Sequence, residues 1–161
     1  MIKNRANVVG KVIYKEDNDL ILQGLECSHI RIKPKEKLDV DVGQIINVCG
    51  RFMADELGCF IGKIREYGIE QHLSSCHFEV AGILKKIEND KMFITKFEGD
   101  NLLTITVMIN GLSNSEELKK LERNTAVKIH GKVFQYIENT YVIKADQISY
   151  LKRNDQLGIV R

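Results

Sequence analysis

The chain has 161 residues, of which 43% are hydrophobic and 29% are charged, and its formal net charge at pH 7 is +2. This length suits one mid-sized domain or two small ones. The near-neutral charge excludes a polybasic nucleic-acid binder, so any phosphate contact must come from locally placed lysines and arginines. No apolar run is long enough to span a membrane, and no signal-type segment begins the chain. We therefore expect an intracellular protein without membrane partners, cytoplasmic and nucleoid-associated or, in a eukaryote, nuclear.

The first half of the sequence predicts five strands. Alternating or continuous apolar residues separated by polar turns indicate each of them. The predicted strands are Val8–Tyr14, Leu20–Leu22, His29–Lys33, Ile45–Met53 and Cys59–Tyr67. The polar connection between the third and fourth strands, Pro34–Gly43, is too weakly patterned for a full helix.

The second half repeats the first. At a shift of 72 residues, Val8–Gly10 falls on Val80–Gly82 and Leu20–Leu22 falls on Met92–Ile94; at a shift of 81, Val48–Arg51 falls on Ile129–Lys132. The change in shift is an insertion between the third and fourth strands, which holds Ser113–Arg123. This segment starts with serine and acidic residues and ends in basic ones, so it predicts a short helix with a serine cap.

Five short strands with a helix position between the third and fourth are typical of the OB-fold, a Greek-key barrel. The sequence therefore predicts an all-β protein with one short helix, built as two tandem five-stranded OB-fold barrels. We expect barrel one in residues 1–70, a short linker at 71–75, barrel two in 76–153 and a C-terminal tail at 154–161. Two unrelated small barrels, or a sandwich with the same number of strands, are the alternatives.

The stretch Val127–Tyr136 combines two different faces. Val127, Ile129, Gly131 and Val133 would face a core, whereas Lys128, His130, Lys132, Phe134 and Tyr136 alternate cations with rings on the other face. Such a surface suits nucleic acid, since rings stack on bases and cations attract phosphates. The mid-strand glycine indicates a bulge or a sharp bend.

Three segments resemble the single-stranded DNA-binding protein and replication protein A superfamily. They are Phe78–Leu84, which opens the second unit, and Ala126–Tyr136 with Tyr141–Tyr150, which close it. The resemblance implies the OB-fold and a role with single-stranded DNA or RNA. It also implies a homodimer, because four barrels are common in that superfamily. The sequence departs from bacterial members in lacking a long acidic tail and any tryptophan.

In an OB barrel the ligand crosses strands two and three, flanked by the hairpin loops. The candidate nucleic-acid-binding residues of the second unit are therefore Lys91, Phe93, Lys96, Thr104, Thr106, Lys132, Phe134, Tyr136 and Tyr141. Those of the first unit are Arg31, Lys33, Arg51 and Lys63, where cations outnumber rings, beside Phe52, Phe60 and Arg65. Phe60, Phe93 and Phe134 could equally be core or inter-barrel packing, and strand lysines could be solvated surface or protection against edge pairing.

No motif in the sequence indicates catalysis or a cofactor. Phosphate-binding glycine loops, nucleophile elbows and HExxH are all missing, and the spacing of His72, Cys76 and His77 is not that of a zinc site. We expect a non-enzymatic protein without cofactor or metal. It would bind single-stranded nucleic acid, with DNA favoured over RNA as the ligand, in replication, recombination or mobile-element maintenance. The alternative is a protein-interaction subunit of a replication or telomere-type complex, with other replication proteins as its partners.

Overall fold

A computed structural model describes residues 4–27, 29–98, 100–137, 140–152 and 154–161 of the chain. Within these ranges the chain forms eleven strands and one short helix. The elements in chain order are β1 (Asn4–Glu16), β2 (Asp19–Gly24), β3 (Ile30–Ile32), β4 (Ile45–Asp55), β5 (Gly58–Glu70), β6 (His77–Glu88), β7 (Lys91–Glu98), β8 (Asn101–Met108), α1 (Ser115–Leu118), β9 (Ala126–Ile137), β10 (Thr140–Leu151) and β11 (Leu157–Val160).

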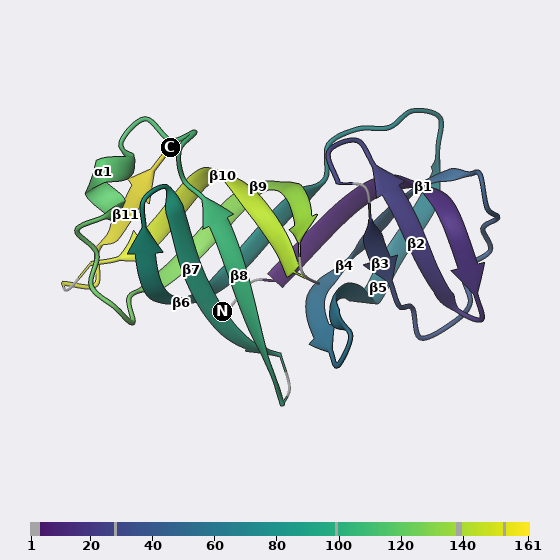
Figure 1. Ribbon diagram of the computed structural model, residues 1–161, viewed down its shortest axis with the longest axis horizontal. Coiled ribbons are helices and arrows are strands. Elements are labelled where there is room, and N and C mark those ends of the chain that lie inside the picture. The colour runs from purple at the N-terminus through teal and green to yellow at the C-terminus, as the bar shows by residue number, and fades with distance from the viewer. Residues whose placement is uncertain (1–3, 28, 99, 138–139, 153) are drawn as a thin grey trace.

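The first five strands close into a barrel (Figure 1). β1 pairs with both β2 and β4, β2 pairs with β3, and β4 pairs with β5, all antiparallel. A parallel contact between β3 and β5 at Ile32 and Ile61 closes the ring. Because the strands close on themselves in the order 1-2-3-5-4, the unit is an OB barrel and not half of a sandwich.

The next five strands repeat that order. β6 pairs with β7 and β9, β7 pairs with β8, β9 pairs with β10, and β8 meets β10 in parallel. The predicted fold class, all-β with two tandem OB barrels, is confirmed. Equivalent positions of the repeat line the two cores, as Val8 with Val80, Leu22 with Ile94, and Val48 with Ile129 are all buried.

The mid-strand glycines lie where two backbones come close together. A Cβ atom added to Gly50 would lie 2.6 Å from the Gly62 carbonyl oxygen, and one added to Gly131 would collide with the Lys144 carbonyl oxygen. In the first barrel the register of β4 and β5 slips at this position, between Cys49 and Arg51. The glycines therefore let the strand pass its partner at an irregular step, which sharpens the bend of a small barrel.

The two barrels close their ends differently. In the second, α1 lies between β8 and β9 and buries Leu118 completely. In the first, no helix forms between β3 and β4, and Leu38 and Val40 are buried instead. The helix is shorter than the predicted 113–123, and the predicted serine cap was wrong. Asn114 is the N-cap, while the Ser113 backbone N–H donates to the Arg161 carbonyl oxygen, 2.8 Å away.

The barrels are joined through the first residues of β1 and β6. These strands pair antiparallel from Asn4 opposite Val80 to Asn7 opposite His77, so one sheet runs through both barrels. The Asn4 side chain donates to the Phe52 carbonyl oxygen and accepts from the Phe52 N–H, both at 2.8 Å. The Phe52 ring packs against that of Phe78 with centroids 4.5 Å apart. At the other end, the segment expected as a tail, 154–161, contributes β11, which pairs with β10.

Candidate nucleic-acid interface

The outer surface of β7 and β8 presents a row of side chains to solvent. Met92 and Ile94 of β7, and Leu103 and Ile105 of β8, point into the barrel and are buried. Since successive strand residues point to opposite sides, the residues between them face outward. We call this surface the β7–β8 face; it consists of Lys91, Phe93, Thr95 and Phe97 from β7 and Leu102, Thr104 and Thr106 from β8.

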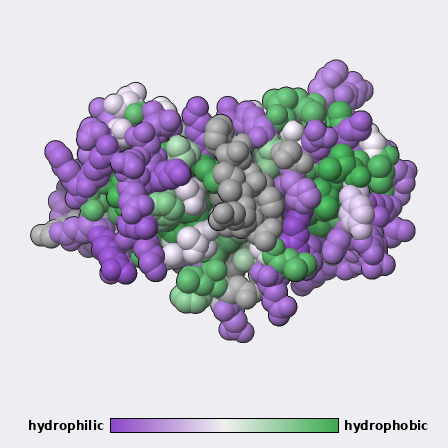
Figure 2. Space-filling view, viewed as in Figure 1, coloured by the Kyte–Doolittle hydropathy of each residue, from purple (hydrophilic) through white to green (hydrophobic). Residues whose placement is uncertain are grey.

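The strand register makes these residues direct neighbours. Phe93 lies opposite Thr106 and Phe97 lies opposite Leu102, with a threonine pair between them. Phe97 is 70% exposed and Leu102 is 50% exposed. Figure 2 shows hydrophobic side chains gathered beside the hairpin of these strands, which projects below the body of the molecule. A ring this exposed makes few packing contacts, so most of its surface is open to a ligand.

Lysines flank the first ring of the β7–β8 face. Lys86, on β6, places its Nζ 5.1 Å from the centroid of the Phe93 ring, within the range of a cation–π contact. The same Nζ lies 3.3 Å from Glu88 Oε1, in a pair exposed to solvent. Lys91 is exposed at the start of β7. A cation next to a half-buried ring suits a nucleotide, whose base stacks while its phosphate meets the charge.

The structure does not bring Lys96 to this face. Only 8% of the residue is exposed, and it lies on the same side of β7 as Met92 and Ile94. Sequence reasoning missed Phe97 instead, although the signal was present. Phe93 and Phe97 are four residues apart on one strand, so they share a face by the alternation that carries Lys96 to the other.

The described side chains of β9 follow the predicted alternation between a buried and an outward-facing side. Val127 and Ile129 are buried, while Lys128, His130 and Lys132 are half-buried on the outside. Two of these outer side chains approach Glu79 of β6, whose Oε1 lies 3.7 Å from Lys128 Nζ and 4.0 Å from His130 Nε2.

Lys132 lies in a cleft of about 430 Å3 where the two barrels meet. Its strand partner Lys144 lines the same cleft, together with Asp146 and with Glu26 from the first barrel. Three further candidates belong to the adjoining part of β9 and β10, where Tyr136 pairs with Tyr141. The side chains of Phe134, Tyr136 and Tyr141 lie outside what the structure describes.

On the equivalent face of the first barrel, an acidic side chain pairs with the two candidate cations. Asp55 Oδ2 lies 3.1 Å from Arg31 Nη2 and 2.8 Å from Lys33 Nζ. Burial alone would raise the pKa of Asp55, but the hydrogen bonds from Arg31 and Lys33 outweigh it and hold the pKa well below its ordinary value of 3.8. The carboxylate is therefore ionised at neutral pH and stabilised by both cations.

Acidic residues also surround this first-barrel face. Glu16, Asp17 and Asp19 line the same depression as Arg31 and Lys33. With Asp55, four carboxylates face two cations, so the surface opposes a polyanion. The rings do not change this, since Phe60 is 9% exposed beneath the two cations and Phe52 is fully buried.

The remaining first-barrel candidates do not join that face. Arg51 is half-buried on β4, and Lys63 is exposed on β5, where it lines a separate depression. Among the residues that the structure describes, no group of three or more His, Cys, Asp or Glu side chains is placed to hold a metal ion. Within the same residues, no helix has the length and apolar character needed to cross a membrane.

Comparisons with known proteins give the arrangement a precedent. No protein-family model and no curated protein matches the sequence. Among solved structures, the wild-type single-stranded DNA binding protein from Thermus aquaticus aligns with a TM-score of 0.64 at 12% identity, covering 94% of both chains. A deletion mutant of it aligns at 0.66 and 13% identity, covering 92% of this chain and 94% of the other. Since both alignments span nearly the whole chain, this protein has the same double-barrel OB-fold as that single-stranded DNA binding protein.

Proposed function

We propose that this protein binds single-stranded DNA, without catalysis, and that the β7–β8 face is its principal contact surface. The observation that carries the proposal is the exposure of Phe97 on the same face as Phe93 and the threonines of β7 and β8, the strands that OB barrels use for ligands. The solved structures that share the fold are described as single-stranded DNA binding proteins, which supports the same assignment.

Binding on this face would combine two contributions. Each base stacked on an exposed ring contributes about 1–3 kcal/mol, with little dependence on base identity. Lys86 and Lys91 lie beside Phe93 and supply charge for the phosphates, while the hydroxyl groups of Thr104 and Thr106 offer hydrogen bonds. This composition favours a strand whose bases are unpaired, because a duplex hides the base faces from the rings.

The biological setting follows as part of the same proposal. A protein that coats exposed strands with low sequence preference serves replication, recombination or the maintenance of mobile elements. Two barrels in one chain favour a homodimer with four, and we place the protein with the DNA, in the cytoplasm and nucleoid or in the nucleus.

The test is a titration of fluorescently labelled oligonucleotides with purified protein, followed by anisotropy. We expect binding to a single-stranded oligonucleotide of about 30 nucleotides that weakens steeply with salt, because each phosphate contact releases a counterion. We expect much weaker binding to a duplex of the same sequence. Equal binding to both forms, or a nearly flat salt dependence, would contradict the proposal.

A second function, as a subunit that binds another protein, is favoured by one observation. Leu151, Leu157 and Ile159 are exposed by 49%, 61% and 46% on β10 and β11, with Leu151 and Leu157 paired across the strands. Apolar side chains grouped on a terminal strand suit a protein partner. Size-exclusion chromatography with and without oligonucleotide separates the two functions, since a binder of DNA alone shifts only when the oligonucleotide is present.

A further inference from the structure

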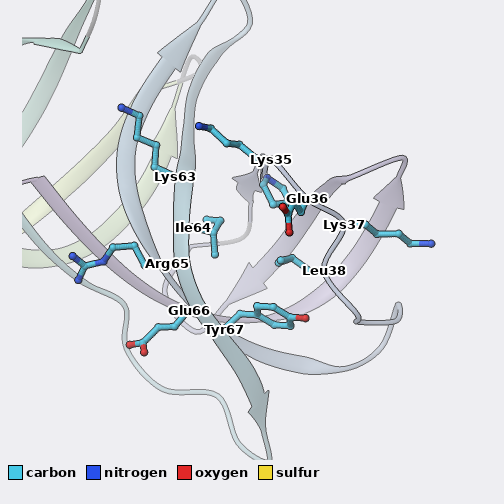
Figure 3. Close-up of a pocket in the computed structure, with 10 residues that line it drawn as sticks. Lys35, Glu36, Lys37, Leu38, Lys63, Ile64, Arg65, Glu66 and Tyr67 are labelled. Carbon is cyan, nitrogen blue, oxygen red and sulfur yellow. The ribbon is translucent and has the colours of Figure 1, made fainter.

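The first barrel carries a cleft that lies apart from the usual OB ligand face. It opens between the connection that follows β3 and the middle of β5, and its volume is about 590 Å3. This volume lies within the range of small-molecule and nucleotide-sized sites, about 300–1,000 Å3. We call it the basic cleft; it is lined by residues 34–38 and 63–67 (Figure 3).

Cations outnumber carboxylates in the basic cleft. Its exposed charged side chains are the cations Lys35, Lys37, Lys63 and Arg65 and the carboxylates Glu36 and Glu66. Among the residues that the structure describes, none of the four cations lies in an ion pair. This balance is the reverse of the neighbouring first-barrel face, where Asp55 holds Arg31 and Lys33.

Two lysines lie at the same end of the cleft. In Figure 3 the Lys35 side chain extends from the loop toward β5 and Lys63 lies on β5 near that end, while Lys37 points away. Lys63 has a φ of 49°, in the left-handed region that residues other than glycine rarely adopt. Backbone strain of this kind clusters at functional sites, and here it falls on an exposed cation that lines the cleft.

The other end of the cleft offers an aromatic ring. Tyr67 is 40% exposed, and its hydroxyl oxygen accepts a hydrogen bond from the Asp39 backbone N–H at 3.1 Å, which fixes the ring beside Leu38. The cleft thus combines, within one depression, exposed ammonium groups that suit phosphates and a held ring that suits a base.

We propose that the basic cleft is a second contact site for single-stranded DNA, in which Lys35 and Lys63 bind backbone phosphates. The inference rests on the proposed function and extends it, because it assigns the first barrel a surface different from the β7–β8 face of the second. Two barrels with the same strand order then hold the strand in different ways. The second holds it by stacking on exposed rings, and the first holds it mainly by charge.

The variant Lys35→Glu/Lys63→Glu tests this inference. Loss of two phosphate contacts makes the slope of log K against log salt about 1.4 less steep. The variant should therefore bind single-stranded DNA about 25-fold more weakly than the wild-type protein at about 0.1 M salt, and equally well near 1 M. The matched control, Lys120→Glu/Lys152→Glu, makes the same charge change at exposed positions of the second barrel, outside both surfaces. Thermal unfolding verifies that both variants are folded.

The outcomes separate this inference from the proposed function. If the wild-type protein binds single-stranded DNA while the cleft variant matches the control in affinity and slope, the basic cleft is not a contact site, yet the proposed function stands. If the cleft variant instead loses binding to a labelled poly-glutamate peptide and keeps its DNA affinity, the cleft serves an acidic protein segment and the inference is overturned. If the wild-type protein binds no DNA, the proposed function itself fails.

Discussion

Truncation of Phe97 to alanine removes the most exposed ring of the β7–β8 face with little cost to folding. A phenylalanine side chain presents about 200 Å2, and 70% of Phe97 is exposed, so the substitution uncovers at most about 60 Å2. At 25 cal/mol per Å2 this corresponds to an upper limit of about 1.5 kcal/mol of unfolding free energy. The loss of one stacked base costs about 1–3 kcal/mol of binding free energy, equivalent to a dissociation constant about 5- to 150-fold higher.

Fluorescence anisotropy with a labelled single-stranded oligonucleotide measures that change. We expect Phe97→Ala to weaken binding while leaving the salt slope unaltered, since the ring carries no charge. The matched control is Leu57→Ala, because Leu57 is also 70% exposed at a hairpin turn but belongs to the acidic first-barrel depression. A Phe97→Ala variant that binds as tightly as the wild-type protein, or a Leu57→Ala variant that weakens binding equally, would refute the stacking role of the β7–β8 face.

Three further predictions concern charge and packing. Asp55→Asn should lower the free energy of unfolding at pH 7 by about 1–3 kcal/mol. Because the folded-state pKa is depressed, this advantage of the wild type is complete above about pH 5 and shrinks as the pH falls further. A difference in unfolding free energy that urea titrations show to be independent of pH would contradict this prediction. Gly131→Ala should cost about 1–3 kcal/mol of unfolding free energy by forcing a Cβ onto the Lys144 carbonyl oxygen. Gly111→Ala should leave the melting temperature almost unchanged, because its Cβ would lie 3.3 Å from the flexible end of Lys144 and 4.0 Å from the Ala145 carbonyl oxygen. Lys91→Ala should reduce the salt slope of DNA binding by about 0.7, and an unchanged slope would remove Lys91 from the interface.

The fold could be predicted from sequence because the repeat supplies what periodicity alone lacks. Alternation in a single unit allows a barrel or a sandwich, but a second copy with an insertion between its third and fourth strands fixes the common strand order. The helix bounds could not be predicted as well. Ser113 was an acceptable cap by composition, yet its N–H is held by the Arg161 carbonyl oxygen, a contact that no local pattern reveals.

The candidate site was predicted less completely. Alternation along a strand predicts which residues belong to the β7–β8 face once one of them is placed. Counting every second residue from Phe93 along β7 would have included Phe97 and left out Lys96. The neutralisation of Arg31 and Lys33 was beyond the sequence, because Asp55 lies more than twenty residues away and approaches them only when the β4–β5 hairpin folds over β3. Charge counted along a chain does not show which cations are already paired.

The central proposal, that this double barrel holds unpaired DNA strands, is tested most directly by one equilibrium measurement. Purified protein is titrated into labelled single-stranded DNA, single-stranded RNA and duplex DNA of one sequence, at two salt concentrations. We expect tight binding to single-stranded DNA at low salt, weaker binding at high salt, and poor binding to the duplex throughout. The absence of binding to single-stranded DNA at low salt, or a preference for the duplex, would contradict it.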